Sequence, residues 1–405
     1  MNFDNVVDRR KTNSVKWNKD AIESICSNKD ALPFWVADMD FYPEEHIKQK
    51  AEEIASLSVF GYPVFDSFTQ IASNWLIKKQ NWEVESDSII FTMGLLHGIA
   101  LAIDIFTDEG DDILVPSPTY RPFRELCSRS KRIMLDHELG YDNGKFFLDR
   151  KRFEEDAKKA KMILFCSPHN PSGLVFNEND LIFVLEVAKK NNIVIVSDEI
   201  HADLVHPGKT HIPMGKANNK INAKCITLMA PSKTFNVAGE HSAIAIFSDK
   251  EMEREFQKRQ EALWLTTPGY VIGELAQVAY KDGLDYNKEL CSYLGNNARF
   301  IRSYLEENCP EIKLVNADAS FVAFLDCSKV YEKIKAKVES MPERYKGGKG
   351  GGILSRFFGV DASVAMNDGT WFGDQYYNFI RFNYGTSLDM VQKGLERIAK
   401  AIKWL

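Results

Sequence analysis

The chain has 405 residues, of which 44% are hydrophobic and 27% are charged, and its formal net charge is −6 at pH 7. A chain of this length and composition can bury large cores, so we expect a soluble globular protein with one large domain and a smaller one. The negative charge provides no basic surface for a phosphate backbone, and nucleic acid is therefore not an expected partner.

The sequence also bears on the compartment. No apolar run reaches the length of a membrane span, and residues 1–19 are charged throughout rather than shaped like a signal peptide. We therefore expect a cytoplasmic protein without a membrane partner. The seven cysteines are scattered, with no Cys-x-x-Cys pair and no metal-like Cys/His spacing. They are expected to be reduced and mostly structural, and no metal site is predicted.

The first forty residues are irregular and end in an apolar stretch, 33–41, which two acids interrupt. This stretch is either a short strand with a solvated turn or an arm that lies over a pocket. Helical spacing over 44–57 predicts a helix. The turn Phe60-Gly61-Tyr62-Pro63 then exposes a tyrosine, and a second helix is predicted over 65–79.

The predicted strand 88–92 turns through Gly94 into an apolar helix that ends near Phe106. A strand that turns through glycine into a helix leaves unpaired backbone N–H groups and the positive end of the helix dipole at the strand tip. Such a turn suits a phosphate. It also occurs in α/β proteins that bind none.

Two further strands lead into proline-rich loops. The strand 112–115 is followed by a loop that presents Tyr120, either for stacking on a flat ring or for ordinary packing. The strand 162–166 is followed by a loop in which Asn170 is held between prolines. That arrangement restrains the amide, but Asn-Pro is also a plain turn dipeptide.

The apolar strand 193–197 ends on Asp198. Consecutive apolar β-formers capped by a carboxylate indicate a strand that is buried on both faces, with the acid at its carboxyl end. A carboxylate there costs free energy unless it meets a cation or several donors. Asp198 therefore needs a partner, and a protonated ring nitrogen would serve.

A single lysine, Lys233, follows shortly after the apolar strand 225–229. Partial burial at the exit of a strand disfavours the ammonium form, and a neutral amine is a nucleophile that can form a Schiff base with an aldehyde. Most lysines are solvated surface charges instead. The assignment therefore depends on the residues that accompany it.

Strand, loop and helix alternate at least five times, which predicts an α/β fold with a doubly wound, mainly parallel sheet. Ligands of such sheets bind beyond the carboxyl ends of the strands. The candidate residues all fall in that position: Gly94, Tyr120, Asn170, Asp198 and Lys233.

The C-terminal part is typical of a smaller α/β unit. It follows a long helix predicted over 287–308, and strands are predicted near 321–325 and 378–382. The glycine-rich run 346–352 lies between these strands and has high conformational entropy. We interpret it as a flexible loop rather than as a functional lid.

Pyridoxal 5′-phosphate would satisfy all five candidate positions. It has an aldehyde for Lys233, a basic ring nitrogen for Asp198 and a phenolate oxygen for Asn170. Its flat ring suits Tyr120, and its phosphate suits the helix that starts at Gly94. A protonated ring nitrogen makes the ring an electron sink for a carbanion at the substrate Cα.

Two more residues gain candidate roles from this cofactor. His201 is placed to donate toward the ring hydroxyl, or is an ordinary hydrogen-bonded histidine. An amino-acid substrate brings a carboxylate, which the planar guanidinium of Arg381 can bind bidentately if its strand enters the cleft. On alternate-face grounds Arg381 would otherwise point to solvent.

Four blocks carry a resemblance to a known family: Asp38–Phe41, Asn170–Gly173, Ser197–Asp203 and Ala230–Asn236. They resemble the aminotransferase class I/II superfamily of fold-type I pyridoxal-phosphate enzymes, and within it the MalY/PatB-type cystathionine β-lyases. The similarity extends from about Val7 to Ile402. It implies a three-layer α/β/α large domain like that of aspartate aminotransferase, with a smaller α/β domain.

The domain boundaries expected from this resemblance divide the chain into three parts. Residues 1–48 form an N-terminal arm and part of the small domain, residues 49–285 form the large cofactor-binding domain, and residues 286–405 form the C-terminal small domain.

The resemblance implies a role for each site residue. Lys233 is the Schiff-base lysine, Asp198 pairs with the pyridine nitrogen, and Asn170 and His201 face the ring oxygen. Lys233 and Tyr120 are the implied catalytic residues. The full set implied to bind the cofactor is Lys233, Asp198, Asn170, His201, Tyr120, Gly94, Leu95, Leu96, Ser232 and Tyr62.

The resemblance also implies the substrate contacts and the assembly. Arg381 binds the substrate carboxylate, and Ala37 and Tyr62 complete the substrate site. Tyr62 would reach the phosphate of the neighbouring subunit, which implies a homodimer with active sites at the subunit interface.

The sequence departs from the family pattern in three places. His241 stands where many superfamily aminotransferases have an arginine, eight residues after the lysine. The segment Arg381–Ser387 differs from the common Arg-Leu-Asn-x-Ala-Cys-Pro-Arg pattern, and the glycines of 347–352 lie where fewer are expected. These departures leave the cofactor residues intact and bear on substrate preference.

The leading hypothesis is β-elimination from L-cystathionine or another S-substituted L-cysteine, which yields a thiol, pyruvate and ammonia, with Lys233 as the general base. The alternative is an aminotransferase of broad amino-acid specificity, which no residue of the sequence excludes. A third hypothesis is a regulatory or binding protein that uses the fold as an interaction surface.

Overall fold

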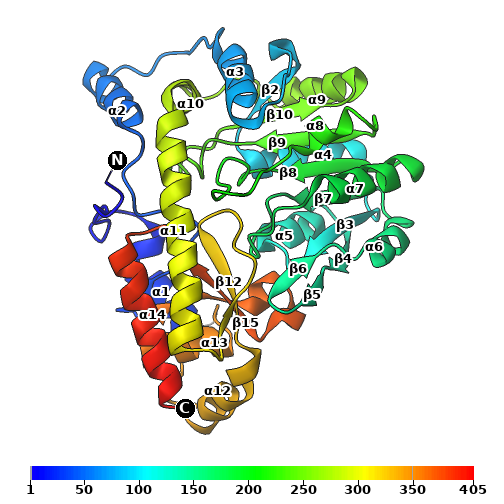
Figure 1. Cartoon of the computed structure of the whole chain (residues 1–405). Helices are drawn as coiled ribbons and strands as arrows, with labels where there is room; N and C mark the ends of the chain where they lie inside the picture. The colour runs from blue at the N-terminus through cyan, green and yellow to red at the C-terminus, as the bar shows by residue number, and fades with distance from the viewer. Residues whose placement is uncertain (1, 349) are drawn as a thin grey trace.

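A seven-stranded sheet forms the larger part of the protein (Figure 1). The computed structural model describes residues 2–348 and 350–405 and orders the strands β2-β10-β9-β8-β7-β3-β4. Only β10 runs antiparallel to its neighbours, so the expected mainly parallel sheet is confirmed. The strands are β2 (Ile89–Thr92), β3 (Asp112–Ser117), β4 (Ile133–Glu138), β7 (Met162–Cys166), β8 (Val194–Asp198), β9 (Cys225–Met229) and β10 (Ala243–Phe247).

Alternate residues of each strand enter two different cores, because successive side chains of a strand point to opposite faces. In β7, Met162 and Leu164 join one core while Ile163 and Phe165 join the other. The first core contains α4 (Leu95–Phe106), α5 (Arg121–Arg129) and α9 (Lys250–Ala262), and the second contains α6 (Arg150–Ala157), α7 (Glu178–Lys190) and α8 (Met214–Asn218). Helices therefore cover both faces of the sheet, as the continuous apolar strands predict.

A smaller antiparallel sheet forms the second unit. Its order is β11-β12-β15-β14. The strands are β11 (Lys313–Leu314), β12 (Val322–Asp326), β14 (Asn367–Asp368) and β15 (Phe379–Asn383), and the helices are α1 (Lys19–Cys26), α12 (Ser328–Ser340), α13 (Ile353–Phe357) and α14 (Leu388–Lys403). The helices α12, α13 and α14 share one core with the sheet, whereas α1 packs in a small core of its own.

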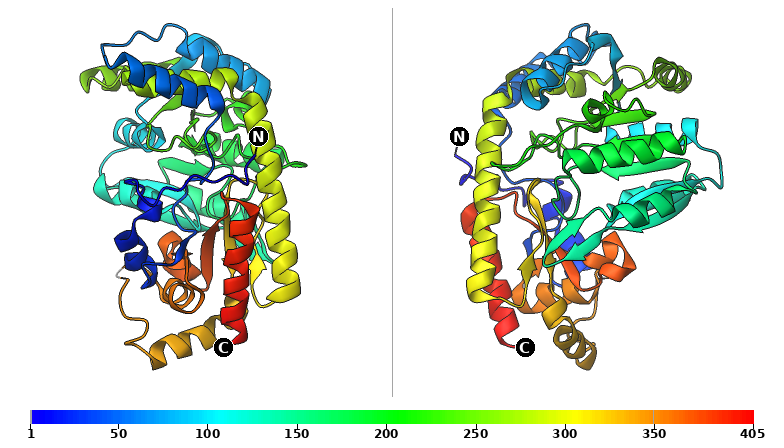
Figure 2. Two further views of the ribbon diagram at one scale, coloured as in Figure 1. Left: turned by 90° about the vertical axis from the view of Figure 1, so that its left-hand side faces the viewer. Right: turned by 45° about the vertical axis from the view of Figure 1, so that its right-hand side comes forward.

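One long helix, α11 (Leu284–Asn308), runs along both units, as Figures 1 and 2 show. Beside it, α2 (Glu45–Leu57), α3 (Phe68–Gln80) and α10 (Tyr270–Asp282) pack near the β2 end of the large sheet. The remaining elements are the pairs β1 (Leu32–Pro33) with β13 (Val364–Ala365) and β5 (Gly140–Asp142) with β6 (Lys145–Phe147), the 3-10 turns Val15–Trp17, Ser86–Ser88, Gly369–Phe372 and Asp374–Tyr376, and a π-helical turn, Phe358–Ala362.

The sequence interpretation missed two strands of the large sheet. β4 is an edge strand whose half-buried residues alternate poorly, so it lacks the apolar run that revealed its neighbours. β10 is short and begins only ten residues after Lys233. The sequence Ala243–Phe247 resembles the end of a loop until its pairing with β2 and β9 is known.

The glycine-rich run 346–352 is a loop in the described residues, as expected, and most of its glycines are closely packed. The N–H of Gly350 donates to the carbonyl of Ser24 at 3.1 Å. A Cβ at Gly351 would lie 1.7 Å from the carbonyl oxygen of Ile25, so only glycine fits there. The glycines at 347, 348, 350 and 351 therefore pack against α1 and its C-terminal end, and Gly352 packs against Asp368. Lys349 lies outside the described residues.

Two further expectations concern cysteines and membrane spans. All seven cysteines are buried, and none forms a disulfide, so they are structural thiols as expected. No helix in the described part of the chain is long and apolar enough to cross a bilayer.

Candidate active site

A cavity of about 280 Å³ opens at the carboxyl ends of the parallel strands. Most of the predicted site residues meet there, although they come from six separate loops. The predicted residues that line it are Ala37, Gly94, Leu95, Leu96, Tyr120, Asn170, Asp198, His201, Ser232 and Lys233. Sequence reasoning did not assign the wall residues His97, Cys166, Ile200, Ala238 and Ser242, which only the fold brings to this place.

Lys233 leaves the loop after β9, and its Nζ donates to the carbonyl oxygen of Ala37 at 2.6 Å. Burial lowers the pKa of Lys233 to about 8, with the charge of Arg381 acting in the same direction and that of Asp38 opposing it. The neutral amine is therefore far more populated near neutral pH than it is for a solvated lysine. This state is the nucleophile that the sequence predicts.

Asp198 ends β8 and is only 3% exposed. Its Oδ1 accepts from the N–H of Ile200 at 3.0 Å, and no lysine or arginine among the described residues forms an ion pair with it. Burial raises the pKa of Asp198 to about 7, and the charge of Glu199 adds to the effect. This carboxylate lacks the cation that its ionised form requires.

Two neighbouring acids, Glu199 and Asp203, differ from Asp198 because side chains of the protein donate hydrogen bonds to them. Glu199 accepts from Ser197 Oγ, Met214 N–H and His211 Nε2 at 2.7–2.9 Å. Asp203 accepts from Trp75 Nε1 at 3.1 Å and from Gln80 Nε2 at 2.7 Å. Both acids therefore support the fold, and Asp198 alone is left for a ligand.

The turn at Gly94 provides a seat for an anion. Gly94 has a φ of 93°, and a Cβ there would approach the Cβ of His241 to 3.2 Å, so the position requires glycine. Gly94 caps α4 without a side chain, and the N–H groups of Leu95 and Leu96 have no acceptor within the part of the chain that the structure describes. These amides and the helix dipole point at the cavity, with Ser232 beside them.

Arg381 enters the site from β15 of the small sheet and is only 5% exposed. Its Nη1 donates to Asn170 Oδ1 at 3.3 Å, and its Nη2 donates to Asn367 Oδ1 at 2.8 Å. Burial lowers the pKa of Arg381 to about 10, which leaves it charged at neutral pH. It has no ion-pair partner in residues 2–348 and 350–405, and its buried Nε has no acceptor there.

A second cavity, of about 340 Å³, adjoins the first and shares Ala37, Tyr120 and Lys233 with it. Arg381 lies in its wall. The other residues of the wall are Trp35, Val36, Pro122, Trp371 and Phe372, with Asn367, Arg121 and Glu125. Lys233 therefore lies between the first cavity, which contains the buried carboxyl group of Asp198, and the second cavity, which contains the buried guanidinium of Arg381.

Residues 36–41, here called the strap, carry the carbonyl of Ala37 to Lys233. The Nδ2 of Asn236 donates to the carbonyls of Met39 and Phe41 at 2.9 Å, and its Oδ1 accepts from the N–H of Met39 at 3.0 Å. The stretch 33–41 is thus an arm over a pocket, which was one of the two predicted alternatives.

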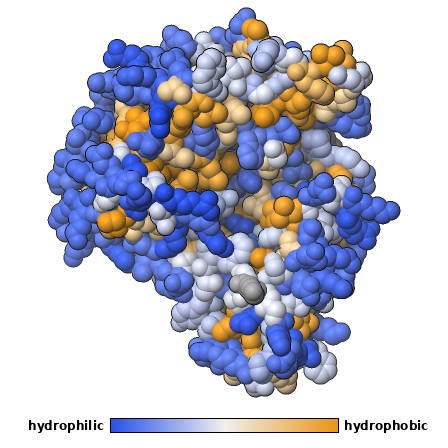
Figure 3. All heavy atoms as spheres, turned by 180° about the vertical axis from the view of Figure 1, so that it is seen from behind, coloured by the Kyte–Doolittle hydropathy of each residue, from blue (hydrophilic) through white to orange (hydrophobic). Residues whose placement is uncertain are grey.

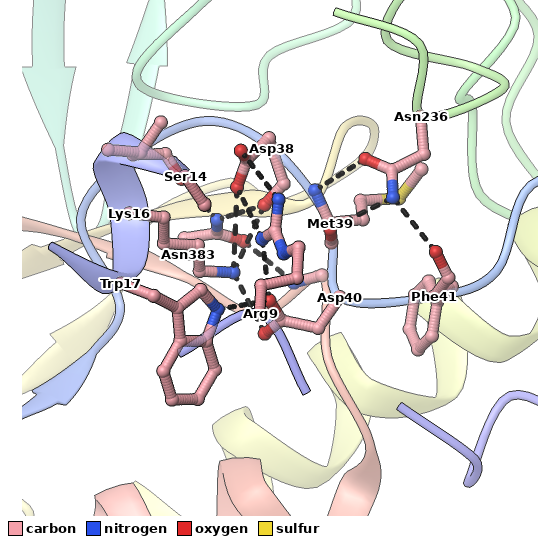
Figure 4. A network of polar contacts seen from close by, with 12 residues as sticks. Arg9, Ser14, Lys16, Trp17, Asp38, Met39, Asp40, Phe41, Asn236 and Asn383 are labelled. Carbon is pink, nitrogen blue, oxygen red and sulfur yellow. Dashed lines mark hydrogen bonds and ion pairs between the residues drawn. The ribbon is translucent and has the colours of Figure 1, made fainter. Parts of the chain in front are cut away.

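Buried charges hold the strap from the other side (Figure 4). Asp40 accepts from Arg9 at 2.8 Å, from Lys16 at 2.9 Å and from Trp17 Nε1 at 3.1 Å. Burial opposes ionisation of Asp40, but Lys16 and Arg9 hold its pKa below the usual value. Sequence reasoning missed these partners, although two acids in an apolar stretch and a charged N-terminus were the available signal.

Tyr62 is the one predicted site residue that lies away from both cavities. It is fully exposed on the segment between α2 and α3, and no residue in the described part of the chain covers it. The fold thus leaves its side chain available to another molecule.

The fold and the residues of the two cavities together indicate the family to which the protein belongs. The chain matches the family model of aminotransferase class I and II over residues 34–398, and it belongs to this family. The family expected from the sequence is therefore confirmed.

Particular relatives narrow the resemblance. The chain is 32% identical to the cystathionine beta-lyase PatB of Bacillus subtilis over 405 residues, which cover 99% of this chain and 100% of the relative. It superposes with a TM-score of 0.88 on cystalysin from Treponema denticola, which contains pyridoxal 5′-phosphate, at 26% identity and coverage of 99% and 98%. A pyridoxal-phosphate-bound C-S lyase from Staphylococcus hominis gives a TM-score of 0.87 at 26% identity, with the same coverage.

The isolated carboxylate leads to a prediction about stability. The pKa of Asp198 in the folded, cofactor-free protein is about 7, against a usual value of 3.8. The folded state therefore binds more protons than the unfolded state between these values, and stability is lost as the pH rises through them. We expect cofactor-free Asp198→Asn to be more stable than the wild type by about 4 kcal/mol at pH 8.

Urea unfolding of both cofactor-free proteins at pH 8 and pH 4 tests this expectation. The difference should shrink strongly at pH 4, where the wild-type carboxyl is largely protonated in the folded protein. An equal difference at both pH values would show that the charge of Asp198 is not its cause.

Proposed function

We propose that the protein is a pyridoxal 5′-phosphate-dependent carbon–sulfur β-lyase, which converts S-substituted L-cysteines of the cystathionine class to a thiol, pyruvate and ammonia. One observation carries the proposal: Lys233 lies between a buried carboxylate and a buried guanidinium, neither of which has an ion-pair partner among the described residues. A cationic ring nitrogen and a substrate carboxylate would supply the two missing charges. The names of the relatives support the same activity.

The donor set of the first cavity fits the cofactor. Lys233 would bind its aldehyde, Asp198 its ring nitrogen, and Asn170 its phenolate oxygen. The phosphate would be held at the start of α4 by Gly94, Leu95, Leu96 and Ser232, and Tyr120 would lie on the ring. When bound, the cofactor withdraws electrons from the substrate Cα and so acidifies its proton.

The protein's own groups would then move this proton. Lys233, released by the substrate amine, is suited to act as a general base because burial lowers its pKa to about 8, close to the working pH of a neutral solution. The carbonyl of Ala37 accepts from Nζ and so orients the amine. Arg381 would hold the substrate carboxylate at the boundary of the second cavity, which leaves the Cβ substituent inside that cavity.

The walls of the second cavity favour an uncharged substituent. Arg121, at its mouth, already pairs with Glu125 at 3.0 Å, and its guanidinium lies 5.2 Å from the centre of the Trp371 ring. The rest of the wall is mainly apolar, so a charged substituent would find no partner there except this half-exposed pair and would lose part of its hydration. We therefore expect S-alkyl and S-benzyl cysteines to be cleaved more efficiently than L-cystathionine, whose distal end is zwitterionic.

A substrate panel tests the function. Holoenzyme is incubated with L-cystathionine, S-methyl-, S-propyl- and S-benzyl-L-cysteine, and both thiol and pyruvate are measured. We expect release of both products, and loss of more than about 10²-fold of the rate in Lys233→Ala, which lacks the general base and the cofactor anchor. Lys258→Ala, an exposed lysine of α9, is the control that should keep full activity.

The panel also discriminates among functions. Amino-group transfer to a 2-oxo acid without thiol release would instead identify an aminotransferase. If no substrate reacts by either route, both enzymatic hypotheses fail.

Arg381→Lys tests the substrate-carboxylate role. Lysine keeps the charge but loses the planar fork that also contacts Asn170 and Asn367. We expect kcat/KM to fall about 10–100-fold, mainly through KM, because charge-assisted hydrogen bonds to the carboxylate are lost. Arg397→Lys, an exposed residue of α14, is the matched control, and an equal loss in both variants would exclude the proposed role.

We also propose that the protein forms a homodimer with active sites at the subunit interface. The segment between α2 and α3 exposes four large apolar side chains, Val59, Phe60, Tyr62 and Val64, and such a cluster is typical of an interface. Apolar side chains also gather over the upper part of the face opposite to that of Figure 1, around a hollow (Figure 3). Tyr62 would complete the phosphate seat of the partner.

Sedimentation equilibrium tests the assembly. The holoenzyme should have about twice the mass of the 46.1 kDa chain. Replacing both Phe60 and Val64 with serine should weaken the association and leave the fold intact, because both side chains are exposed. A wild-type protein that sediments as a monomer at micromolar concentration would contradict the proposal.

A further inference from the structure

Ser320 lies where the loop after β8 meets the segment before β12. Val205 and Ala319 pair there across the two segments. The N–H of Ser320 donates to the carbonyl of Leu204 at 2.8 Å, and its own carbonyl accepts from His206 Nε2 at 2.8 Å. Tyr384 donates to the same carbonyl at 2.9 Å. The backbone of Ser320 is thus fixed from three directions.

The backbone of Ser320 is also strained. Its φ is 73°, in the left-handed region that glycine adopts readily and serine does not. Residues keep such conformations where the surrounding contacts impose them, and they concentrate at functional sites. Stability alone would favour glycine at this position, so the hydroxyl needs an explanation of its own.

The hydroxyl contacts a residue of the active site. Ser320 Oγ lies 3.1 Å from Nδ1 of His201, which is only 1% exposed and lines the first cavity with Lys233. The ring also packs edge-on against Phe321, with the ring centres 6.0 Å apart. Its Nε2 has no hydrogen-bond partner in the described part of the chain, so this nitrogen is the one left to the cavity.

The His201 ring is neutral and carries a single N–H. Burial lowers the pKa of His201 to about 3, and the charges of Lys233 and Arg381 act in the same direction. A neutral imidazole has one donor and one acceptor nitrogen, and the partner of one nitrogen decides the role of the other. The contact to Ser320 therefore determines what the ring offers to the cavity.

The cavity wall beside His201 requires a donor. Asn170 accepts from Arg381 through Oδ1, which leaves its amide N–H groups without a partner among the described residues. Donors from Asn170 and His201 can then converge on one anionic oxygen, whereas a lone pair on Nε2 would repel it.

We propose that Ser320 is a positioning residue. Its hydroxyl donates a hydrogen bond to Nδ1 of His201 and so keeps the ring N–H on Nε2, where it faces an anionic oxygen of the bound ligand. The proposal rests on the proposed function only in taking that ligand to be pyridoxal 5′-phosphate.

The substitution Ser320→Gly distinguishes the effect of the hydroxyl from the effect of the strained backbone. Glycine relieves the left-handed φ, so we expect the unfolding midpoint in urea to stay the same or to rise. The loss of the hydroxyl should lower the affinity for pyridoxal 5′-phosphate about 5–10-fold, as expected for one hydrogen bond. It should also move the ring ¹⁵N shifts of His201 toward a mixture of tautomers, in protein labelled at its eight histidines.

The signal of His201 is assigned by comparison with His201→Gln. Ser27→Gly is the matched control, because Ser27 also has a left-handed φ, of 62°, and lies in the small unit at the end of α1. It should change neither cofactor affinity nor the His201 signal.

Two results would overturn the proposal: wild-type affinity and tautomer in Ser320→Gly, or an equal loss of affinity in Ser27→Gly. Neither measurement uses a substrate. A failed thiol and pyruvate assay would therefore refute the proposed reaction without deciding the role of Ser320.

Discussion

The site depends on two buried ionisable groups of opposite sign that no other described residue neutralises. Asp198 ends a strand of the large sheet, and Arg381 comes from a strand of the small one. Each would be costly in isolation, and neither has an ion-pair partner among the described residues. Their stabilisation is left to ligands, and the lysine between them is shifted toward its neutral form by the same burial.

Holding such charges apart requires a rigid frame, and the N-terminal strap contributes to it. Arg9 and Lys16 neutralise Asp40 on one side of the strap, while Asn236 fixes the strap from the lysine loop on the other. Apart from the buried Nε of Arg9, the charged groups of this network pair with one another, in contrast to those of the cavities. Paired charges thus mark the strap as part of the scaffold, whereas unpaired buried charges mark the binding site.

Much of this arrangement could be predicted from the sequence because its signals are local. Apolar runs that end in Gly94, Asn170, Asp198 and Lys233 revealed the parallel strands, and the rule for ligands of parallel sheets brought these residues together. The partners of these elements are not local. No pattern shows that Asn236 bonds the strap, that Glu199 is satisfied by His211, or that the glycines near 350 pack on α1.

The antiparallel course of β10 has a consequence for the mobility of the lysine. In the register of the sheet, Ile244 pairs with Met229, so both ends of the 230–242 segment are anchored side by side on the same rim. The ends of this segment cannot leave the rim without breaking the hydrogen bonds that β10 makes to β2 and β9, and Asn236 ties its middle to the strap. Lys233 thus extends from a backbone that is held on both sides, and rotations within its own methylene chain are the simplest way to displace its amine.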